Sequence, residues 1–249
     1  MKDARVLHQG ENVTLRDLSA QWREATMSEM YVYNFNWLGR PIIQYPTDIV
    51  ALQEIIWRTR PDLIIETGIA HGGSLLLSAS MLALLDLCDA RTELNPSTAI
   101  TKPRQVVGVD IEIRDHNRSA IESHPLSGSI HMIQGSSVDP SVVDQVAEIA
   151  SNYDRVMVCL DSNHTHEHVS AELEAYSPLV SSGNYCIVFD TFIEDLPSGF
   201  FVDRPWDAGN SAGSAARHFM QSHPEFEVDR TIEAQLLVTV APGGFLRRR

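Results

Sequence analysis

The spacing of hydrophobic residues predicts alternating strands and helices from about residue 61 onward. Continuous apolar runs are typical of strands covered on both faces, whereas apolar residues three or four positions apart are typical of amphipathic helices. The predicted strands are Asp62–Glu66, Gln105–Asp110, Ile130–Gln134, Arg155–Asp161 and Tyr185–Asp190. Repeated strand–helix units of this kind predict a parallel sheet with helices on both faces.

Three stretches between these strands have helical character. Ser74–Leu87 is rich in Leu and Ala, and His166–Leu179 has apolar residues at helical spacing. Another helix is predicted to begin after Asp139, an N-cap residue, with Pro140 at its first position. The fold class that follows is a Rossmann-like α/β fold.

The C-terminal region predicts a different ending for the sheet. Ala212–Ser222 has the pattern of a helix, and Phe226–Val228 and Ile232–Val240 have the pattern of two strands joined by a tight turn. We therefore expect an antiparallel hairpin at the edge of a mostly parallel, seven-stranded sheet. Asp89–Arg104 and Ile193–Gly213 are polar and rich in Pro, Gly or Asn, so they are expected to be loops.

The first 60 residues have another pattern, with helices predicted around Leu15–Met27 and from Thr47 to Arg58. We interpret residues 1–60 as an N-terminal helical extension and residues 61–249 as the ligand-binding domain. Three roles are open for the aromatic stretch Tyr31–Trp37: lining a substrate pocket, packing on the domain, or forming a subunit interface.

Composition and charge narrow the class of partner. Hydrophobic residues make up 43% of the chain, which is enough for a real core. A formal net charge of −14 disfavours nucleic acid or an anionic membrane as the main partner. No continuous apolar run has the length of a membrane span, and Met1–Arg5 lacks the apolar core of a signal peptide. We expect a cytoplasmic protein that binds a small molecule.

A glycine-rich turn follows the first predicted strand and precedes a helix. Glycines allow a sharp turn and close approach of a ligand, and the first N–H groups of the helix favour an anionic group. The pattern here is ExGxxxGxS rather than the dinucleotide pattern GxGxxG. It resembles the first motif of class I methyltransferases, and the alternative is a purely structural turn. The S-adenosylmethionine-binding residues that this resemblance predicts are Glu66, Gly68, Ala70, Gly72 and Ser74.

The next two strand ends carry polar residues. Asp110 ends the second strand, where a carboxylate can accept hydrogen bonds from both ribose hydroxyls, as it also does in NAD-binding folds. Ser136 and Ser137 follow the third strand, and in class I methyltransferases this loop borders the adenine. A helix-entry turn before Asp139 is compatible with that role.

Acidic residues end the last two parallel strands. Asp161 and Asp190 should lie at one rim, where two carboxylates repel each other unless they are protonated or bridged by a cation. Hard oxygen ligands favour Mg²⁺, which can lower the pKa of a bound hydroxyl. His164, three residues after Asp161, is placed to take a proton near neutral pH and to act as the catalytic base.

The histidines at 164, 166 and 168 allow another interpretation. A set of two histidines and one carboxylate would indicate a non-haem iron enzyme. Residues two apart on a helix point in different directions, so His166 and His168 are expected at the helix surface or at the substrate rather than at a metal.

In order and spacing, these motifs resemble the cephalosporin hydroxylase/rhamnosyl O-methyltransferase family of bacterial class I methyltransferases. The similar segments are Trp37–Gly39, Arg60–Ser74, Val109–Ile111, Gly135–Ser137, Leu160–His164, Phe189–Thr191, Phe226–Arg230 and Leu237–Arg247. The resemblance implies a S-adenosylmethionine-binding domain at 61–249, an acceptor cover at 1–60, and Mg²⁺-dependent methyl transfer to a hydroxyl. Some relatives have Glu-Asp where this chain has Phe189-Asp190, so a possible third carboxylate ligand is missing.

The resulting hypothesis is an O-methyltransferase for a hydroxyl of a rhamnose-like deoxysugar linked to a nucleotide or natural product. Asp161 and His164 are its predicted catalytic residues, Asp161 also contacts the cofactor, and Asp161 and Asp190 bind the metal. The alternatives are a methyltransferase for a β-lactam or aromatic scaffold and a non-haem iron hydroxylase. We expect the protein to form a homo-oligomer.

Overall fold

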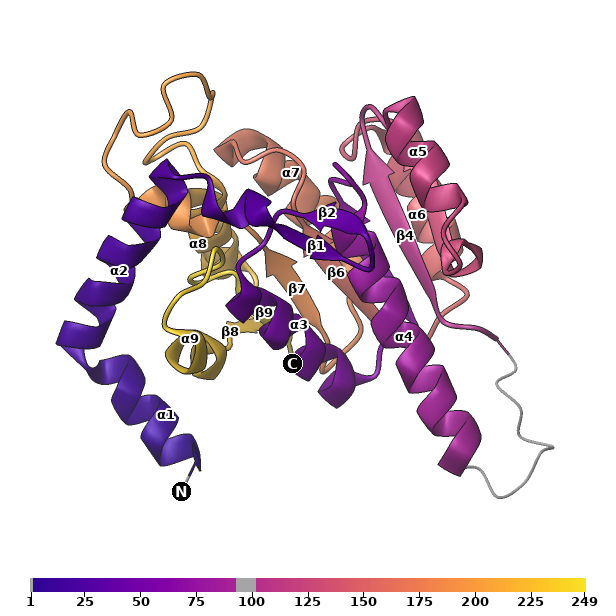
Figure 1. Ribbon diagram of the computed structural model, residues 1–249, viewed down its shortest axis with the longest axis horizontal. Helices are drawn as coiled ribbons and strands as arrows, with labels where there is room; N and C mark the ends of the chain where they lie inside the picture. The colour runs from indigo at the N-terminus through magenta and orange to yellow at the C-terminus, as the bar shows by residue number, and fades with distance from the viewer. Residues whose placement is uncertain (1, 93–101) are drawn as a thin grey trace.

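The computed structural model describes residues 2–92 and 102–249 and contains a seven-stranded sheet (Figure 1). The strand order is β5-β4-β3-β6-β7-β9-β8. The strands from β5 to β7 are parallel, and β9 and β8 are antiparallel neighbours at one edge. The bounds are β3 (Leu63–Thr67), β4 (Gln105–Asp110), β5 (Ile130–Gln134), β6 (Val156–Leu160), β7 (Tyr185–Val188), β8 (Phe226–Val228) and β9 (Phe245–Arg248). The predicted fold class is confirmed, including an antiparallel C-terminal hairpin.

Helices cover both faces of this sheet. They are α3 (Pro46–Thr59), α4 (Gly73–Thr92), α5 (Asp115–Glu122), α6 (Pro140–Ala150), α7 (His166–Tyr176) and α8 (Ala212–Ser222). The N-cap of α6 is Asp139, as predicted, and its side chain accepts a 2.8 Å hydrogen bond from Ser141 N. The helix predicted at His166–Leu179 ends at Tyr176 and continues as the 3-10 turn Ser177–Leu179.

Neighbouring residues of the central strands face opposite sides of the sheet, so each strand contributes to two cores. In β3, Ile64 packs on the side of α3, α4 and α5, and Ile65 packs on the side of α6, α7 and α8. Every residue of β3 and β6 is buried, which explains their continuous apolar runs. Each buried Leu, Ile or Val contributes roughly 1.5–3 kcal/mol, so the two cores fix the strand ends that carry the site.

The apolar helix α4 is longer than predicted and includes the start of the expected loop Asp89–Arg104. The middle of that expected loop, residues 93–101, lies outside the described residues. By length and composition alone, Gly73–Arg91 could cross a membrane, although the sequence contains no continuous apolar run of that length. Half of this stretch is buried inside the protein. An apolar helix in the core of a folded domain has the same composition.

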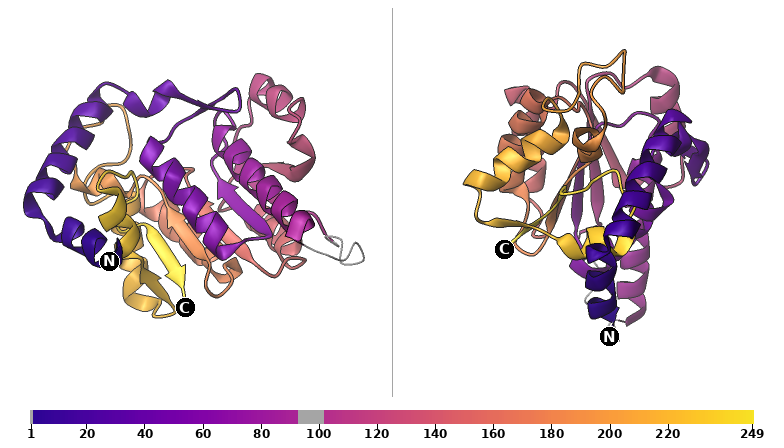
Figure 2. Two further views of the ribbon diagram at one scale, coloured as in Figure 1. Left: turned by 60° about the horizontal axis from the view of Figure 1, so that its bottom comes forward. Right: turned by 90° about the vertical axis from the view of Figure 1, so that its left-hand side faces the viewer.

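The first 60 residues pack on the rest of the chain. α1 (Lys2–Glu11), which was not predicted, lies beside α9 (Arg230–Leu236), and α2 (Val13–Ser28) continues toward the carboxyl edge of the sheet (Figures 1 and 2). β1 (Phe35–Trp37) and β2 (Arg40–Ile42) form a hairpin, in which Trp37 Nε1 donates a 3.0 Å hydrogen bond to Ser80 Oγ of α4. The division into two parts at residue 60 stays a prediction.

The prediction of a strand at Ile232–Val240 is wrong. Most of this segment belongs to α9, and the second strand of the hairpin is β9, which follows the turn at residues 242–244 and lies between β7 and the edge strand β8. Asp229 caps α9 by accepting a 3.1 Å hydrogen bond from Thr231 N, and Ile232 is buried by packing. The cap and the packing against α1 outweigh the β propensity of the Leu237–Val240 run.

Candidate active site

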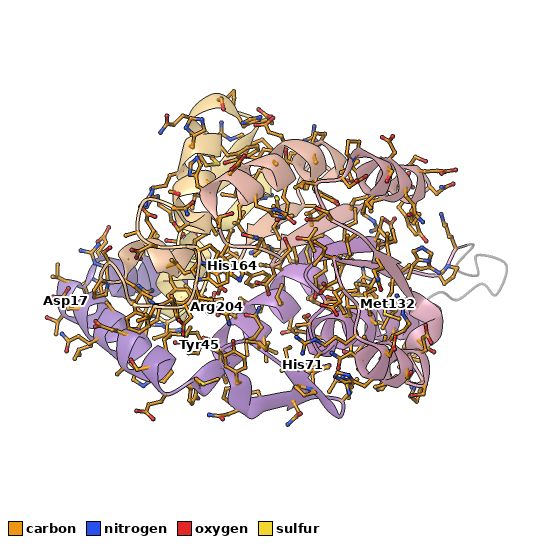
Figure 3. The ribbon with its side chains drawn as sticks, turned by 90° about the horizontal axis from the view of Figure 1, so that it is seen from above. Asp17, Tyr45, His71, Met132, His164 and Arg204 are labelled. Atoms are coloured by element: carbon orange, nitrogen blue, oxygen red, sulfur yellow. The ribbon has the colours of Figure 1, made fainter. Side chains whose placement is uncertain are left out.

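The carboxyl ends of the parallel strands open into a cavity of about 450 Å³. Its wall comes from the turn after β3, the loop after β6, the segment after β7 and the N-terminal segment around β2. Figure 3 looks onto this edge from above and labels His71, His164 and Arg204, three of the lining side chains. The cavity therefore lies where open parallel sheets bind their ligands.

The cofactor turn, Gly68–Ser74, lies against the end of β6. Gly68 has a φ of 90°, in the region that favours glycine, and a Cβ at this position would collide with the carbonyl group of Asp161. Gly68, Ala70 and Ser74 line the cavity, whereas Gly72 lies behind it against α5. Contact between these residues and S-adenosylmethionine stays a prediction.

Glu66 lies beneath the cofactor turn and is 3% exposed. It accepts a hydrogen bond from Ser74 Oγ, which ties the end of β3 to the first turn of α4. Burial raises the pKa of Glu66 to about 7, and the bond from Ser74 partly opposes this shift. Glu66 thus shapes the turn from behind.

Asp110 holds the cofactor turn from β4. Its Oδ2 accepts hydrogen bonds from Ile69 N at 2.8 Å and Ala70 N at 3.1 Å, and its Oδ1 accepts one from Glu112 N at 3.0 Å. A carboxylate has about four lone-pair sites, so Asp110 retains capacity for a ribose hydroxyl.

Two residues that the sequence reasoning missed also support the cofactor turn. Asn117 is buried, and its Nδ2 donates a 2.8 Å hydrogen bond to the Ala70 carbonyl. Arg40 donates to Asn117 Oδ1 at 2.6 Å and to the His71 carbonyl at 2.9 Å. No motif marks either residue, because both contacts depend on how β2 and α5 pack around the turn.

The two serines after β5 have different surroundings. Ser136 accepts a hydrogen bond from Asp139 N through its carbonyl, as in a helix-entry turn. Ser137 is buried, and its Oγ lies 3.0 Å from His168 Nε2. The same His168 nitrogen lies 3.2 Å from Ser162 Oγ, so the loops after β5 and β6 are connected. Neither serine lines the cavity, and their adenine contact stays a prediction.

The metal edge, Asp161, His164 and Asp190, brings together the predicted metal and base residues. One ligand atom from each lies within 4.8 Å of the others, and His164 Nε2 is 3.1 Å from Asp190 Oδ2. His166 instead bonds to Ser214 in α8. Among the described residues, this cluster has one histidine and two carboxylates, which differs from the two-histidine set of non-haem iron enzymes.

The metal edge is destabilised by charge repulsion and by the burial of its carboxyl groups. Burial, with the nearby Asp190 charge, raises the pKa of Asp161 well above its usual range. Burial also raises the pKa of Asp190, and His164 opposes that shift. Asp190 has a φ of 54°, a left-handed conformation that is uncommon outside glycine. Such a pair needs a proton or a cation between its members.

The segment after β7 closes the outer side of the cavity. The ring centroids of Trp206 and His164 are 4.7 Å apart in an edge contact, and the Arg204 guanidinium lies 5.2 Å from the Trp206 ring. Glu194 fixes this segment, since its Oε2 accepts hydrogen bonds from Gly209 N at 3.0 Å and from Ser211 Oγ at 2.5 Å.

Comparisons with known proteins identify similar sequences and folds. A rhamnosyl O-methyltransferase of Mycobacterium leprae is 27% identical over 222 residues, which are 88% of this chain and 86% of that protein. The Mycobacterium tuberculosis protein of the same name is 27% identical over 207 residues, or 81% and 73% of the two chains. A CmcI structure with Mg and S-adenosylmethionine has the same fold, with a TM-score of 0.56 at 17% identity over 87% of this chain and 77% of that one.

The family assignment rests on a match that covers most of the chain. The model of the family described as rhamnosyl O-methyltransferase/CmcI matches residues 29–249, which include the cofactor turn and the metal edge. The resemblance found in the sequence motifs is thereby confirmed. The chain belongs to the rhamnosyl O-methyltransferase/CmcI family of S-adenosylmethionine-dependent O-methyltransferases.

Proposed function

We propose that the protein uses Mg²⁺ and S-adenosylmethionine to methylate a hydroxyl of a rhamnose-like deoxysugar linked to a nucleotide or natural product. The observation that carries this proposal is that the metal edge and the cofactor turn face one cavity. Similarity to two rhamnosyl O-methyltransferases supports a sugar as the acceptor.

The cofactor turn fits S-adenosylmethionine. This cofactor supplies a methyl group that is already electrophilic, so the protein must chiefly hold and orient it. Gly68 allows the turn to pack against the end of β6, the N-terminus of α4 favours the cofactor carboxylate, and Asp110 has capacity for its ribose hydroxyls. Good alignment of reacting groups is worth roughly 7–11 kcal/mol.

The metal edge fits a divalent cation because Asp161 and Asp190 provide the hard oxygen ligands that Mg²⁺ prefers. A bound Mg²⁺ polarises a hydroxyl and lowers its pKa. His164 accepts the hydroxyl proton, and the Asp190 carboxylate, 3.1 Å from Nε2, stabilises the resulting imidazolium. General-base help of this kind contributes roughly 10²–10⁴-fold.

The outer wall of the cavity fits a glycosyl acceptor. The indole of Trp206 and the side chains of Met27 and Tyr33 offer apolar contact to one face of a sugar ring. The exposed guanidinium of Arg204 is suited to a phosphate oxygen, as in a nucleotide-linked sugar.

The test is methyl transfer from labelled S-adenosylmethionine to a panel of TDP-deoxysugars, glycosylated natural products, catechols and β-lactams. We expect mass spectrometry to detect one added methyl group on a sugar acceptor, and its loss after treatment with EDTA. A product formed only with catechol or β-lactam would overturn the sugar assignment. Full activity of metal-stripped protein would overturn the role of Mg²⁺.

A further inference from the structure

Gln44 is a buried polar residue beside the metal edge that none of the sequence motifs includes. It lies between β2 and α3, is 3% exposed and lines the cavity. Its Nε2 is 3.4 Å from Asp161 Oδ2, whereas its Oε1 is buried and has no hydrogen-bond partner among residues 2–92 and 102–249. A buried amide oxygen without a partner is unfavourable, so protein contacts alone do not satisfy the Gln44 amide.

We propose that the side-chain oxygen of Gln44 is a third oxygen ligand of the divalent cation, alongside Asp161 and Asp190. This inference rests on the proposed binding of Mg²⁺ at the metal edge. Amide oxygens are ligands of hard cations, like carboxylate oxygens. This third ligand comes from the N-terminal segment, far in sequence from the strands that carry the two carboxylates.

The position before Asp190 supplies no oxygen ligand. Phe189 is an apolar core residue with 3% exposure. Gln44 approaches the same metal edge from the opposite wall, through its contact with Asp161. An amide oxygen adds no charge. A site that consists of two ionised carboxylates, the Gln44 amide and one Mg²⁺ therefore has no net charge.

The side-chain amide of Gln44 can present either of its polar atoms to Asp161. Its nitrogen and oxygen are nearly indistinguishable in shape, and half a turn of the amide exchanges their positions. In the structure Nε2 lies 3.4 Å from Asp161 Oδ2, and in the rotated form Oε1 takes this place. Two oxygens this close repel each other unless a cation is shared between them, so the rotated form would suit the protein with a bound cation.

The backbone around Gln44 is fixed before any ligand binds. Ile42 and Tyr45, on either side of it, are each 1% exposed and belong to the core. The Tyr45 hydroxyl lies 3.0 Å from Thr26 Oγ1 of α2, and Thr47 Oγ1 donates a 2.7 Å hydrogen bond to the Val238 carbonyl. Gln44 is therefore held in place by tertiary packing, as a metal ligand must be.

The test measures cation binding directly, without acceptor or turnover. The dissociation constants of Mg²⁺, by calorimetry, and of Mn²⁺, by electron paramagnetic resonance, are compared for the wild type and the variants Gln44→Leu, Gln44→Glu and Gln9→Leu. We expect Gln44→Leu to weaken binding by roughly 10- to 100-fold. Gln44→Glu should bind at least as tightly as the wild type, because it adds a charged oxygen ligand. Gln9→Leu, the matched change at a glutamine outside the cavity whose Nε2 donates to the Ala234 carbonyl, should leave both constants unchanged.

Three results would overturn the inference. Wild-type affinity in a Gln44→Leu protein with a normal thermal unfolding curve would exclude Gln44 as a ligand and leave the proposed function intact. The same affinity combined with a raised KM for the acceptor would assign Gln44 to the acceptor instead. A wild-type protein that binds neither cation would overturn the inference together with the metal dependence of the proposed function.

Discussion

The cofactor turn and the metal edge face the same cavity but are built in opposite ways. In the turn, Asp110 binds two backbone N–H groups, and Asn117 and Arg40 bind two carbonyls. At the metal edge, two carboxylates with raised pKa values lie close together, and Asp190 has a left-handed backbone. The turn is complete before any ligand binds, whereas the edge is strained until a cation or proton arrives.

This difference predicts opposite effects of mutation in the two regions. Substitutions around the turn should lower stability and cofactor affinity together, because the same hydrogen bonds serve both. Substitutions at the metal edge should lower the reaction rate without lowering stability, a trade-off that is common where a site is strained for function.

The largest effect is expected for His164→Ala. The variant should lose roughly 10²–10⁴-fold in kcat, because the other two side chains of the metal edge are carboxyl groups assigned to the cation. The rate of methyl transfer at saturating cofactor and acceptor measures this. The matched control is His166→Ala, which removes a histidine that bonds to Ser214 instead. Equal losses in the two variants would show that His164 has no special role as base.

Glu66→Gln should remove a large pH-dependent contribution to stability. The pKa of Glu66 is raised by burial from 4.5 to about 7, so this contribution is fully present below pH 4.5 and is lost as the pH rises through 7. The change amounts to about 3 kcal/mol. Chemical denaturation between pH 5 and 8 should therefore show a flatter profile in the variant.

Asp48 keeps part of the pH dependence in that variant, since burial also raises its pKa to about 7. The double variant Glu66→Gln, Asp48→Asn should have the flattest profile. An unchanged pH dependence of stability in Glu66→Gln would mean that Glu66 is ionised throughout this range. The cofactor turn would then be packed against a buried, charged carboxylate.

Asn117→Ala tests the support of the cofactor turn. It removes the hydrogen bond to the Ala70 carbonyl and one of the two hydrogen bonds of Arg40, so we expect a loss of about 1–3 kcal/mol in the free energy of unfolding and weaker binding of S-adenosylhomocysteine. Urea denaturation and calorimetry measure the two effects. The nearby surface variant Arg118→Ala serves as the control. A loss of stability with unchanged cofactor affinity would separate the two functions that we assign to the turn.

The sequence predicted the parts of the site that follow from strand order. Asp161 and Asp190 end buried apolar runs of adjacent parallel strands, so the pattern alone brings them to one rim. The cofactor turn is likewise local, since it connects one strand to the next helix. These predictions needed only the periodicity of hydrophobic residues and the chemistry of the residues that follow each run.

The parts that were missed depend on packing between distant segments. Arg40, Asn117 and Gln44 carry no motif and act through partners far along the chain. The C-terminal strand was misplaced because the alternation in Ile232–Val240 resembles a strand, while the Asp229 cap and the contact with α1 favour a helix. Local pattern does not contain information about such tertiary neighbours.

Asp190→Asn should give the smallest change and the most direct view of strain at the metal edge. Without divalent cations, we expect the free energy of unfolding to rise by about 1 kcal/mol, because the variant removes the repulsion with Asp161 and Asn tolerates the left-handed backbone. With Mg²⁺ at 100 times its Kd, the wild type should gain about 2.7 kcal/mol that the variant lacks. Thermal unfolding in EDTA and in MgCl₂ measures both terms. A variant that is less stable than the wild type in EDTA would mean that the His164–Asp190 contact stabilises the protein by more than the repulsion between Asp161 and Asp190 destabilises it. The metal edge would then be free of strain before a cation binds, as the cofactor turn is before its ligand binds.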